Sequence, residues 1–316
     1  MPLDQATRIG AETPPLPEGP PYACRELQAW AGGAFWMPAS DPRLEALHDG
    51  GPSPSPPMDN LEGLVRAWSE HPEWLDFLDP SAPNHEDKML ERAIYLTHWG
   101  PWLPGSGRVL DLGGGCGRFT AALLDRGLDV EVVDPDLRSL WRTLQHAAGR
   151  AGRVDLHWGT GETLPKLQPV DLVVAAEVLN YCEDPAAILA NCNAVLKPGG
   201  ALLLSVEARW GWAAALDAHP GTLEALFSDG IVHVPGDVWV RTYEEQDLRT
   251  LLQGFEIELL LPTHYTLSGP FEAAAGPMDL KAALTWEARL RDHPRTRPWN
   301  RAWLAVARKS LEPANY

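Results

Sequence analysis

Residues 107–120 read Gly-Arg-Val-Leu-Asp-Leu-Gly-Gly-Gly-Cys-Gly-Arg-Phe-Thr, and this stretch decides the fold. Its apolar run at 109–112 carries one acid, Asp111, and leads directly into a cluster of glycines, after which apolar residues resume at helical spacing. The pattern predicts a strand, a tight glycine turn and a helix. Glycines let the backbone approach a ligand closely, and the first turn of the helix offers unpaired N–H groups. The turn is therefore typical of a cradle for a nucleotide-type ligand.

Strands and helices alternate on the C-terminal side of this turn. Strands are expected at 129–133, 154–158, 171–175 and 201–206, with helices after Asp136 and at 185–196. Such alternation with short connections implies right-handed crossovers and a parallel sheet covered on both faces. Two late strands, at 255–261 and 302–307, fall outside this alternation of strands and helices, which predicts an antiparallel edge strand. The expected fold class is α/β, a doubly wound, mostly parallel seven-stranded sheet with an antiparallel edge strand.

The N-terminal part differs in composition from the rest. Residues 1–84 combine a proline-rich leader with a segment rich in tryptophan and other large apolar side chains, which predicts a helical extension that acts either as a scaffold or as a lid. An amphipathic helix at 85–99 then opens a domain that spans 85–316. Looser patterns near 207–240 and 262–298 are expected to be insertions, the second with a helix at 280–290.

Composition limits the range of partners. The 316 residues hold 26 Lys and Arg against 43 Asp and Glu, which gives a net charge of −17 and no basic run. This charge argues against duplex nucleic acid and anionic membranes as partners and favours a small molecule.

Cysteine usage indicates a reducing compartment. The four cysteines contain no Cys-x-x-Cys pair, so neither a disulfide framework nor a metal site is expected. With no secretory or membrane-spanning apolar stretch in view, we expect a cytoplasmic protein.

Taken together, residues 109–206 resemble a class I S-adenosylmethionine-dependent methyltransferase. The resemblance rests on Asp111-x-Gly113-x-Gly115-x-Gly117, on the 171–180 segment followed by Glu183-Asp-Pro185, and on Leu196-Lys-Pro-Gly-Gly200, a turn motif that ends the helix at 185–196 before a strand. It covers about a third of the chain. Gly159-Thr160-Gly161-Glu162 departs from the pattern, because relatives often carry an acid where Thr160 stands. The hydroxyl of Thr160 or the backbone groups of this loop would then bind the adenine.

The resemblance implies S-adenosyl-L-methionine as cofactor and methyl transfer to a small-molecule acceptor. In that family the glycine turn holds the methionine part of the cofactor, and an acid that ends the second strand, here Asp134, binds the ribose hydroxyls. A carboxylate suits this task because it can accept from two donors. The expected cofactor-binding residues are Asp111, Gly113, Gly115, Gly117, Asp134, Pro135, Thr160, Gly161 and Glu177.

Methyl transfer from a sulfonium is an in-line displacement that needs a held nucleophile and the exclusion of water. A hydroxyl nucleophile also benefits from a base, for which His264 and His233 are the candidates. Two alternative functions stay open. One is a nicotinamide-dependent oxidoreductase, although its Gly-x-Gly-x-x-Gly motif is absent: the third glycine is replaced by Arg118 when counted from Gly113 and by Thr120 when counted from Gly115. The other is a non-catalytic cofactor-binding protein. The sequence leaves the acceptor, the atom that is methylated and the oligomeric state undetermined.

Overall fold

The computed structural model describes residues 26–28, 34–36, 76–162, 164–215, 222–234 and 238–311. Within these ranges, nine strands form one sheet in the order β1-β2-β5-β4-β3-β6-β7-β11-β10. Their bounds are β1 Glu26–Gln28, β2 Ala34–Trp36, β3 Arg108–Leu112, β4 Asp129–Asp134, β5 Val154–Trp158, β6 Val170–Ala176, β7 Leu196–Glu207, β10 Glu256–Thr263 and β11 Ala302–Arg308.

The sheet is parallel from β2 to β7 and antiparallel at both ends, where β1 pairs with β2 and where β11 pairs with β7 and β10. β11 runs antiparallel to both of its neighbours, β7 and β10, so β10 is the outermost strand and β11 lies one place further in. All seven predicted strands are present, and the doubly wound, mostly parallel sheet with an antiparallel edge strand is confirmed; β1 and β2 are two strands beyond the predicted seven.

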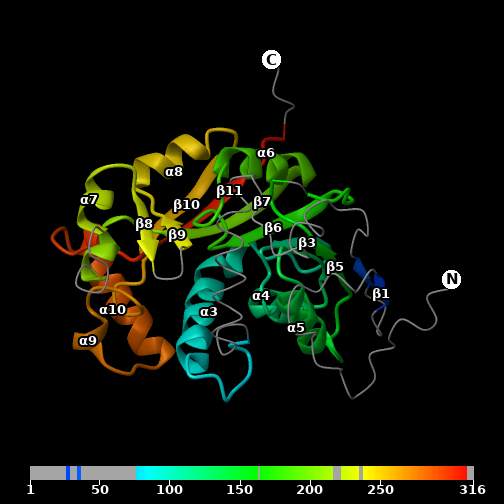
Figure 1. Cartoon of the computed structure of the whole chain (residues 1–316), viewed down its shortest axis with the longest axis horizontal. Coiled ribbons are helices and arrows are strands. Elements are labelled where there is room, and N and C mark those ends of the chain that lie inside the picture. Colours follow the sequence, from blue (N-terminus) through cyan, green and yellow to red (C-terminus); the bar gives the residue numbers. More distant parts are fainter. Residues whose placement is uncertain are drawn as a thin grey trace.

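Alternate residues of the central strands enter two apolar cores, one on each face of the sheet. Val109 of β3 belongs to one core and Leu110, the next residue, to the other, which is why these strands read as nearly continuous apolar runs. The first core is covered by α3 His85–Trp99, α4 Arg118–Leu124, α5 Leu137–Ala147 and α10 Leu280–Asp292, and the second by α6 Pro185–Val195 and α8 Glu245–Leu251. Figure 1 shows these two groups of helices on opposite sides of the sheet.

The predicted helices at 85–99 and 280–290 are present as α3 and α10. The turn expected at 197–200 is instead the start of β7, because Gly199 donates to Lys309 O at 3.1 Å and Lys309 donates to Gly200 O at 2.9 Å. Pairing with a distant part of the chain thus overrides the local turn signal of Pro198 and two glycines.

The first insertion holds a β-hairpin that the sequence pattern did not predict. Its described elements are the 3₁₀ helix η5 Trp210–Ala215, α7 Thr222–Phe227, β8 Ile231–Val234 and β9 Val238–Arg241. Trp212, Leu226, Val232 and Val240 form a small core of its own. The second insertion contains α9 Glu272–Ala275, α10 and the 3₁₀ helix η6 Arg297–Trp299, and a further 3₁₀ turn, η4 Gly100–Trp102, follows α3.

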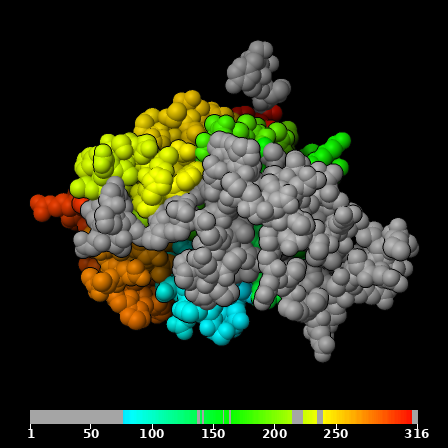
Figure 2. Space-filling view, viewed as in Figure 1, coloured from blue at the N-terminus to red at the C-terminus, as the bar shows by residue number. Residues whose placement is uncertain are grey.

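Most of the predicted helical extension at 1–84 lies outside the described residues. The parts that are described are β1, β2 and residues 76–84, and β2 adds to the sheet by parallel pairing with β5. In the space-filling view, the first insertion (yellow-green) and the second (orange) lie on the same side of the molecule, with α3 (cyan) next to the second (Figure 2). Among the described helices, none combines the length and the apolar character that a membrane span requires.

Candidate active site

The glycine turn after β3 has a backbone that side chains would disrupt. Gly113, Gly115 and Gly117 have φ angles of +65°, +56° and +92°, in the left-handed region that favours glycine. Gly113 also donates to Val133 O at 2.7 Å, which ties the turn to β4. A Cβ added at Gly113 would lie 2.6 Å from Val178 Cγ2, whereas one at Gly115 would meet no atom within 4 Å. The turn is thus tightly packed against Val178 at Gly113, whereas at Gly115 it faces open space.

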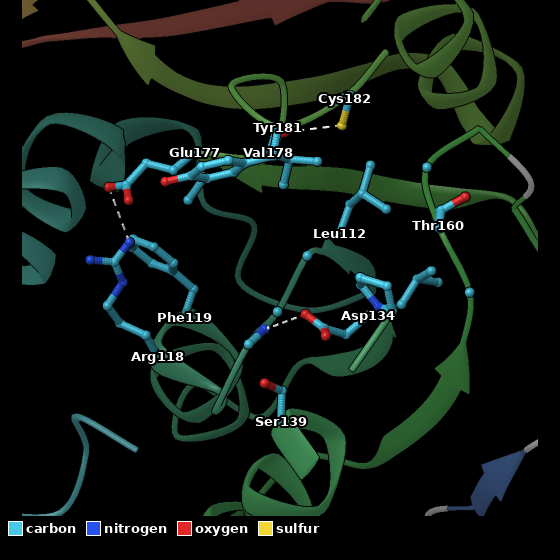
Figure 3. Close-up of a pocket in the computed structure, with 18 of the residues that line it drawn as sticks. Leu112, Arg118, Phe119, Asp134, Ser139, Thr160, Glu177, Val178, Tyr181 and Cys182 are labelled. Carbon is cyan, nitrogen blue, oxygen red and sulfur yellow. Dashed lines mark hydrogen bonds and ion pairs between the residues drawn. The ribbon is translucent and has the colours of Figure 1, made fainter. Parts of the chain in front are cut away.

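Asp134, at the end of β4, holds the turn from the other side. Its Oδ2 accepts from the backbone N–H of Gly115 and its Oδ1 from that of Asp136, both at 2.8 Å (Figure 3). The residue is 4% exposed. Burial raises the pKa of Asp134 to about 7, against the opposing effect of these two hydrogen bonds.

Asp111 lies behind the turn and not on the cavity wall. Its Oδ2 accepts from Thr120 Oγ1 at 2.5 Å, so it fixes the beginning of α4. Burial raises the pKa of Asp111 to about 6. Gly117 is likewise placed at the N-terminus of α4, where an added Cβ would lie 3.1 Å from Thr143 Oγ1. The direct cofactor contacts expected of these two residues stay predictions.

A cavity of about 240 Å³, which we call the glycine cavity, opens at the carboxyl ends of β3, β4, β5 and β6. This is the edge where open α/β sheets bind their ligands. Seven predicted residues line it: Gly113, Gly115, Asp134, Pro135, Thr160, Gly161 and Glu177. Its other lining residues include Phe77, Cys116, Arg118, Phe119, Ser139, Val178, Tyr181 and Cys182, of which several are labelled in Figure 3. Apolar and aromatic side chains among them give the cavity a largely apolar wall with a few fixed polar groups.

Arg118 is the main functional side chain that the sequence reading missed. It is buried, it donates through Nη1 to Glu91, and its Nη2 lies 3.4 Å from Glu177 Oε1. Its guanidinium also lies 4.8 Å from the centre of the Phe119 ring. Although burial opposes the charged form, Glu91 and Glu177 raise the pKa of Arg118 above its usual value. Its position in the sequence, directly after the glycine turn, could have indicated that Arg118 lies beside the cavity.

A second cavity, of about 160 Å³, adjoins the first. This polar cavity is lined by Lys88, Glu91, Tyr95, Glu177, Tyr181, Val206, Glu207, His264, Ser268, Arg301 and Ala302. Glu177 and Tyr181 line both cavities. Glu177 is held by Tyr95, whose hydroxyl donates to its Oε1 at 3.1 Å.

The structure separates the two histidines named from the sequence. His264 is 2% exposed and lines the polar cavity, with Nε2 3.4 Å from Glu91 Oε1. Among the described residues, no hydrogen-bond partner meets its Nδ1. His233, on β8, is exposed and belongs to the lining of neither cavity.

His264 sits on a clamped loop. Its φ of +61° is unusual for a residue with a side chain. The neighbouring residues are fixed by the buried carboxylate of Glu287 on α10, which accepts from the backbone N–H groups of Tyr265 and Thr266 at 2.9 and 3.0 Å. The hydroxyls of Thr263 and Thr266 donate to the same carboxylate at 3.2 and 2.9 Å.

A doubly wound sheet with this glycine turn, and with an acid at the end of the adjacent strand, is the arrangement of class I S-adenosylmethionine-dependent methyltransferases. The chain belongs to the methyltransferase domain family, whose model matches residues 84–260. S-Adenosylmethionine is the cofactor of this family. The nicotinamide-dependent alternative finds no support in these matches.

Named relatives agree with this family. Over 147 residues the chain is 38% identical to the ubiquinone biosynthesis O-methyltransferase of Xanthomonas campestris pv. campestris (strain B100), covering 45% of this chain and 59% of the relative. It is 29% identical over 176 residues to an uncharacterised methyltransferase of Mycobacterium bovis, covering 54% of this chain and 70% of that one. The chain thus spans about three fifths of the length of the first of these relatives.

Solved structures show the same fold at low sequence identity. An S-adenosylmethionine-dependent methyltransferase from Mesorhizobium loti is 22% identical with a TM-score of 0.52, over 70% of this chain and 100% of that chain. The 1,6-didemethyltoxoflavin-N1-methyltransferase of Burkholderia thailandensis is 18% identical with a TM-score of 0.50, over 90% of this chain and 99% of that chain.

Proposed function

We propose that this protein transfers a methyl group from S-adenosylmethionine, bound in the glycine cavity, to a small-molecule acceptor bound in the polar cavity. The observation that carries this proposal is that Glu177 and Tyr181 line both cavities, so a ligand in one meets a ligand in the other at their shared wall. The net charge of −17 supports a small molecule over a nucleic acid. The name of the Xanthomonas relative also supports a small-molecule acceptor.

The residues present fit the cofactor. A Cβ at Gly115 would enter open space, so the backbone there is accessible to a ligand, and Asp134 keeps acceptor capacity beyond its two backbone hydrogen bonds. We assign Asp134 to the ribose hydroxyls, and Gly113, Gly115, Pro135, Thr160 and Gly161 to the remaining cofactor contacts. The cofactor supplies an electrophilic methyl group on a sulfonium.

The protein's own contribution is positioning and proton removal. Glu177 is held on the shared wall by Tyr95 and Arg118, which fixes one side of the meeting point of the ligands. His264 accepts the proton of an acceptor hydroxyl, and Glu91, 3.4 Å away, stabilises the resulting imidazolium. Burial of His264 keeps bulk water from competing for this proton.

Calorimetry with S-adenosylmethionine and S-adenosylhomocysteine tests the cofactor assignment. We expect both to bind, and Asp134→Ala to weaken binding by about tenfold or more because a charge-assisted hydrogen bond is lost. Asp129→Ala, an exposed position at the opposite end of β4, is the matched control and keeps full affinity. No heat with either ligand, together with clear binding of a nicotinamide dinucleotide, would reject the proposal.

Turnover tests the chemistry. A metabolite panel incubated with labelled cofactor identifies acceptors, and His264→Asn is expected to lower kcat by about 10²-fold or more while cofactor affinity is unchanged. An unchanged kcat in this variant would remove His264 from the mechanism. His233→Asn, exposed on β8, serves as the comparison for the second predicted base.

We further propose that residues 85–316 form the methyltransferase domain and that the preceding extension encloses the ligands. Phe77, which precedes α3 in the chain, supports enclosure because it lines the glycine cavity. The neighbouring Asp76 holds this segment against α5, since its Oδ1 lies 2.8 Å from His146 Nε2. Phe77→Ala should raise the KM for the cofactor if this segment covers it, and an unchanged KM would count against enclosure.

We also propose a cytoplasmic location. It is supported by Cys116, Cys182 and Cys192, all free thiols, and cell fractionation tests it.

A further inference from the structure

The polar cavity brings buried and half-buried charged side chains close together. Three cationic side chains meet there or pair with its wall, and three carboxylates face them: Lys88, Arg118 and Arg301 against Glu91, Glu177 and Glu207. These three positive and three negative charges cancel.

Each charge already has an opposite partner in the wall. Lys88 Nζ lies 3.0 Å from Glu91 Oε2, and Arg118 contacts both Glu91 and Glu177. Although burial opposes charge on both groups, their interaction raises the pKa of Lys88 and lowers that of Glu91, so this pair stays ionised. A charge brought by a ligand would therefore find no partner in this part of the wall.

Arg301 and Glu207 form the remaining pair, and it is poorly satisfied. Arg301 Nη1 lies 3.3 Å from Glu207 Oε2, but both atoms are buried without a hydrogen bond among the described residues. Burial raises the pKa of Glu207, and Arg301 counteracts this rise. The two groups compensate each other's charge while keeping one donor and one acceptor available to a ligand.

The pair is also held in place. The backbone N–H of Arg301 donates to Thr263 O and His264 O at 3.2 and 3.0 Å, and its guanidinium lies 3.8 Å from the centre of the Trp212 ring. The backbone N–H of Glu207 donates to Asn180 Oδ1 at 2.9 Å. A preorganised donor and acceptor side by side on a cavity wall is typical of a recognition element.

We propose that the polar cavity selects an uncharged acceptor with hydroxyl or amide groups, which Arg301 and Glu207 recognise together by donating to it and accepting from it. The proposal rests on the proposed function and specifies its substrate class. An anionic or cationic acceptor is disfavoured because its charge would be buried beside a wall whose own charges are already compensated. His264, whose Nδ1 has no partner among the described residues, supplies the third polar contact.

Three ring compounds that differ in one substituent, and through it in charge, test this selection. Dihydroxybenzamide, dihydroxybenzoate and dihydroxybenzylamine, with their hydroxyls at the same ring positions, are neutral, anionic and cationic at neutral pH. Binding is measured by calorimetry with saturating S-adenosylhomocysteine. We expect the amide to bind about tenfold or more tightly than either charged analogue. Equal or tighter binding of a charged analogue, or binding of none of the three, overturns the proposal.

Reciprocal variants sharpen the test. Glu207→Gln leaves Arg301 without its carboxylate and should shift the preference toward the benzoate by about tenfold, whereas Arg301→Gln should shift it toward the benzylamine. Glu256→Gln, an exposed position on β10, makes the same change away from the cavity and should shift nothing. If neither cavity variant changes the preference, the pair does not recognise the acceptor.

S-Adenosylhomocysteine separates this proposal from the proposed function. Each variant is first shown to bind it with wild-type affinity and to melt cooperatively. A wild-type protein that fails to bind it contradicts the methyltransferase proposal itself. A protein that binds it but discriminates none of the three ring compounds contradicts only the neutral-acceptor proposal.

Discussion

Replacement of Glu287 by glutamine should both destabilise the protein and displace His264. The carboxylate is 1% exposed and accepts from four donors on the 263–266 loop, two of them backbone N–H groups. Glutamine keeps one carbonyl oxygen and turns an NH₂ group toward donors. Oε1 accepts from three of the four donors, so a glutamine oxygen in its place keeps those three without the carboxylate charge, and the hydroxyl of Thr263 loses its acceptor.

The magnitude follows from that count. A hydrogen bond to a charged group contributes about 1.5–3 kcal/mol, and a buried donor left unpaired loses its solvation as well. We expect Glu287→Gln to lower the free energy of unfolding by about 2–4 kcal/mol, since one hydrogen bond is lost and three lose their charged acceptor, measured by urea denaturation. Relaxation of the loop should release His264 from its left-handed conformation, so kcat falls while affinity for S-adenosylhomocysteine is kept.

Asp292→Asn is the control for this prediction. It makes the same change from acid to amide on the same helix, where the side chain is 75% exposed, so stability should change by less than about 0.5 kcal/mol. A loss below about 1 kcal/mol in Glu287→Gln would refute the clamp. A normal loss of stability with unchanged kcat would show that the clamp is structural and does not position His264.

Three further perturbations have defined outcomes. Because burial raises the pKa of Asp134 to about 7, the folded ligand-free protein binds more protons than the unfolded chain. The stabilisation from this group is therefore complete below about pH 4 and is lost as the pH rises to about 7. The melting temperature should change less with pH across this range in Asp134→Asn than in the wild type, and an equal change would contradict the raised pKa. Arg118→Met leaves Glu91 buried without one of its cations and should cost about 3–5 kcal/mol in denaturant unfolding, so a change under about 1 kcal/mol would contradict its structural weight. Gly152→Ala places a Cβ 2.0 Å from Leu128 O and should lower the free energy of unfolding by about 1–3 kcal/mol, whereas wild-type stability would show that the backbone there moves freely.

The core of the fold was predictable because its signals are local. The run at 109–112 followed by glycines encodes a strand and a turn within a few residues, and the amphipathic spacing of 85–99 encodes α3 without reference to any partner. The hairpin β8–β9 was not predicted because each strand has four residues and its partner supplies most of its definition. The early start of β7 was missed for the same reason, since pairing near Lys309 extends it.

The two cavities also differ in how far their residues could be predicted from local sequence patterns. Asp134 and the glycines of the first cavity stand in one βαβ segment, so their spacing along the chain identified them. The polar cavity draws Glu91 from α3, Glu207 from the end of β7 and Arg301 from the residue before β11. Long-range folding brings these side chains together, and no local pattern connects them.

This difference has a consequence for specificity. The family model matches residues 84–260, which include the glycine turn, Asp134 and Glu177 but end before His264, Glu287 and Arg301. The part of the site assigned to the cofactor thus lies within the matched range, whereas the proposed base, its clamp and half of the recognition pair lie beyond it. Membership of the family therefore carries the cofactor chemistry to this chain but not the choice of acceptor. The acceptor must be read from the charges and hydrogen-bonding groups of the polar cavity, and these favour a neutral one.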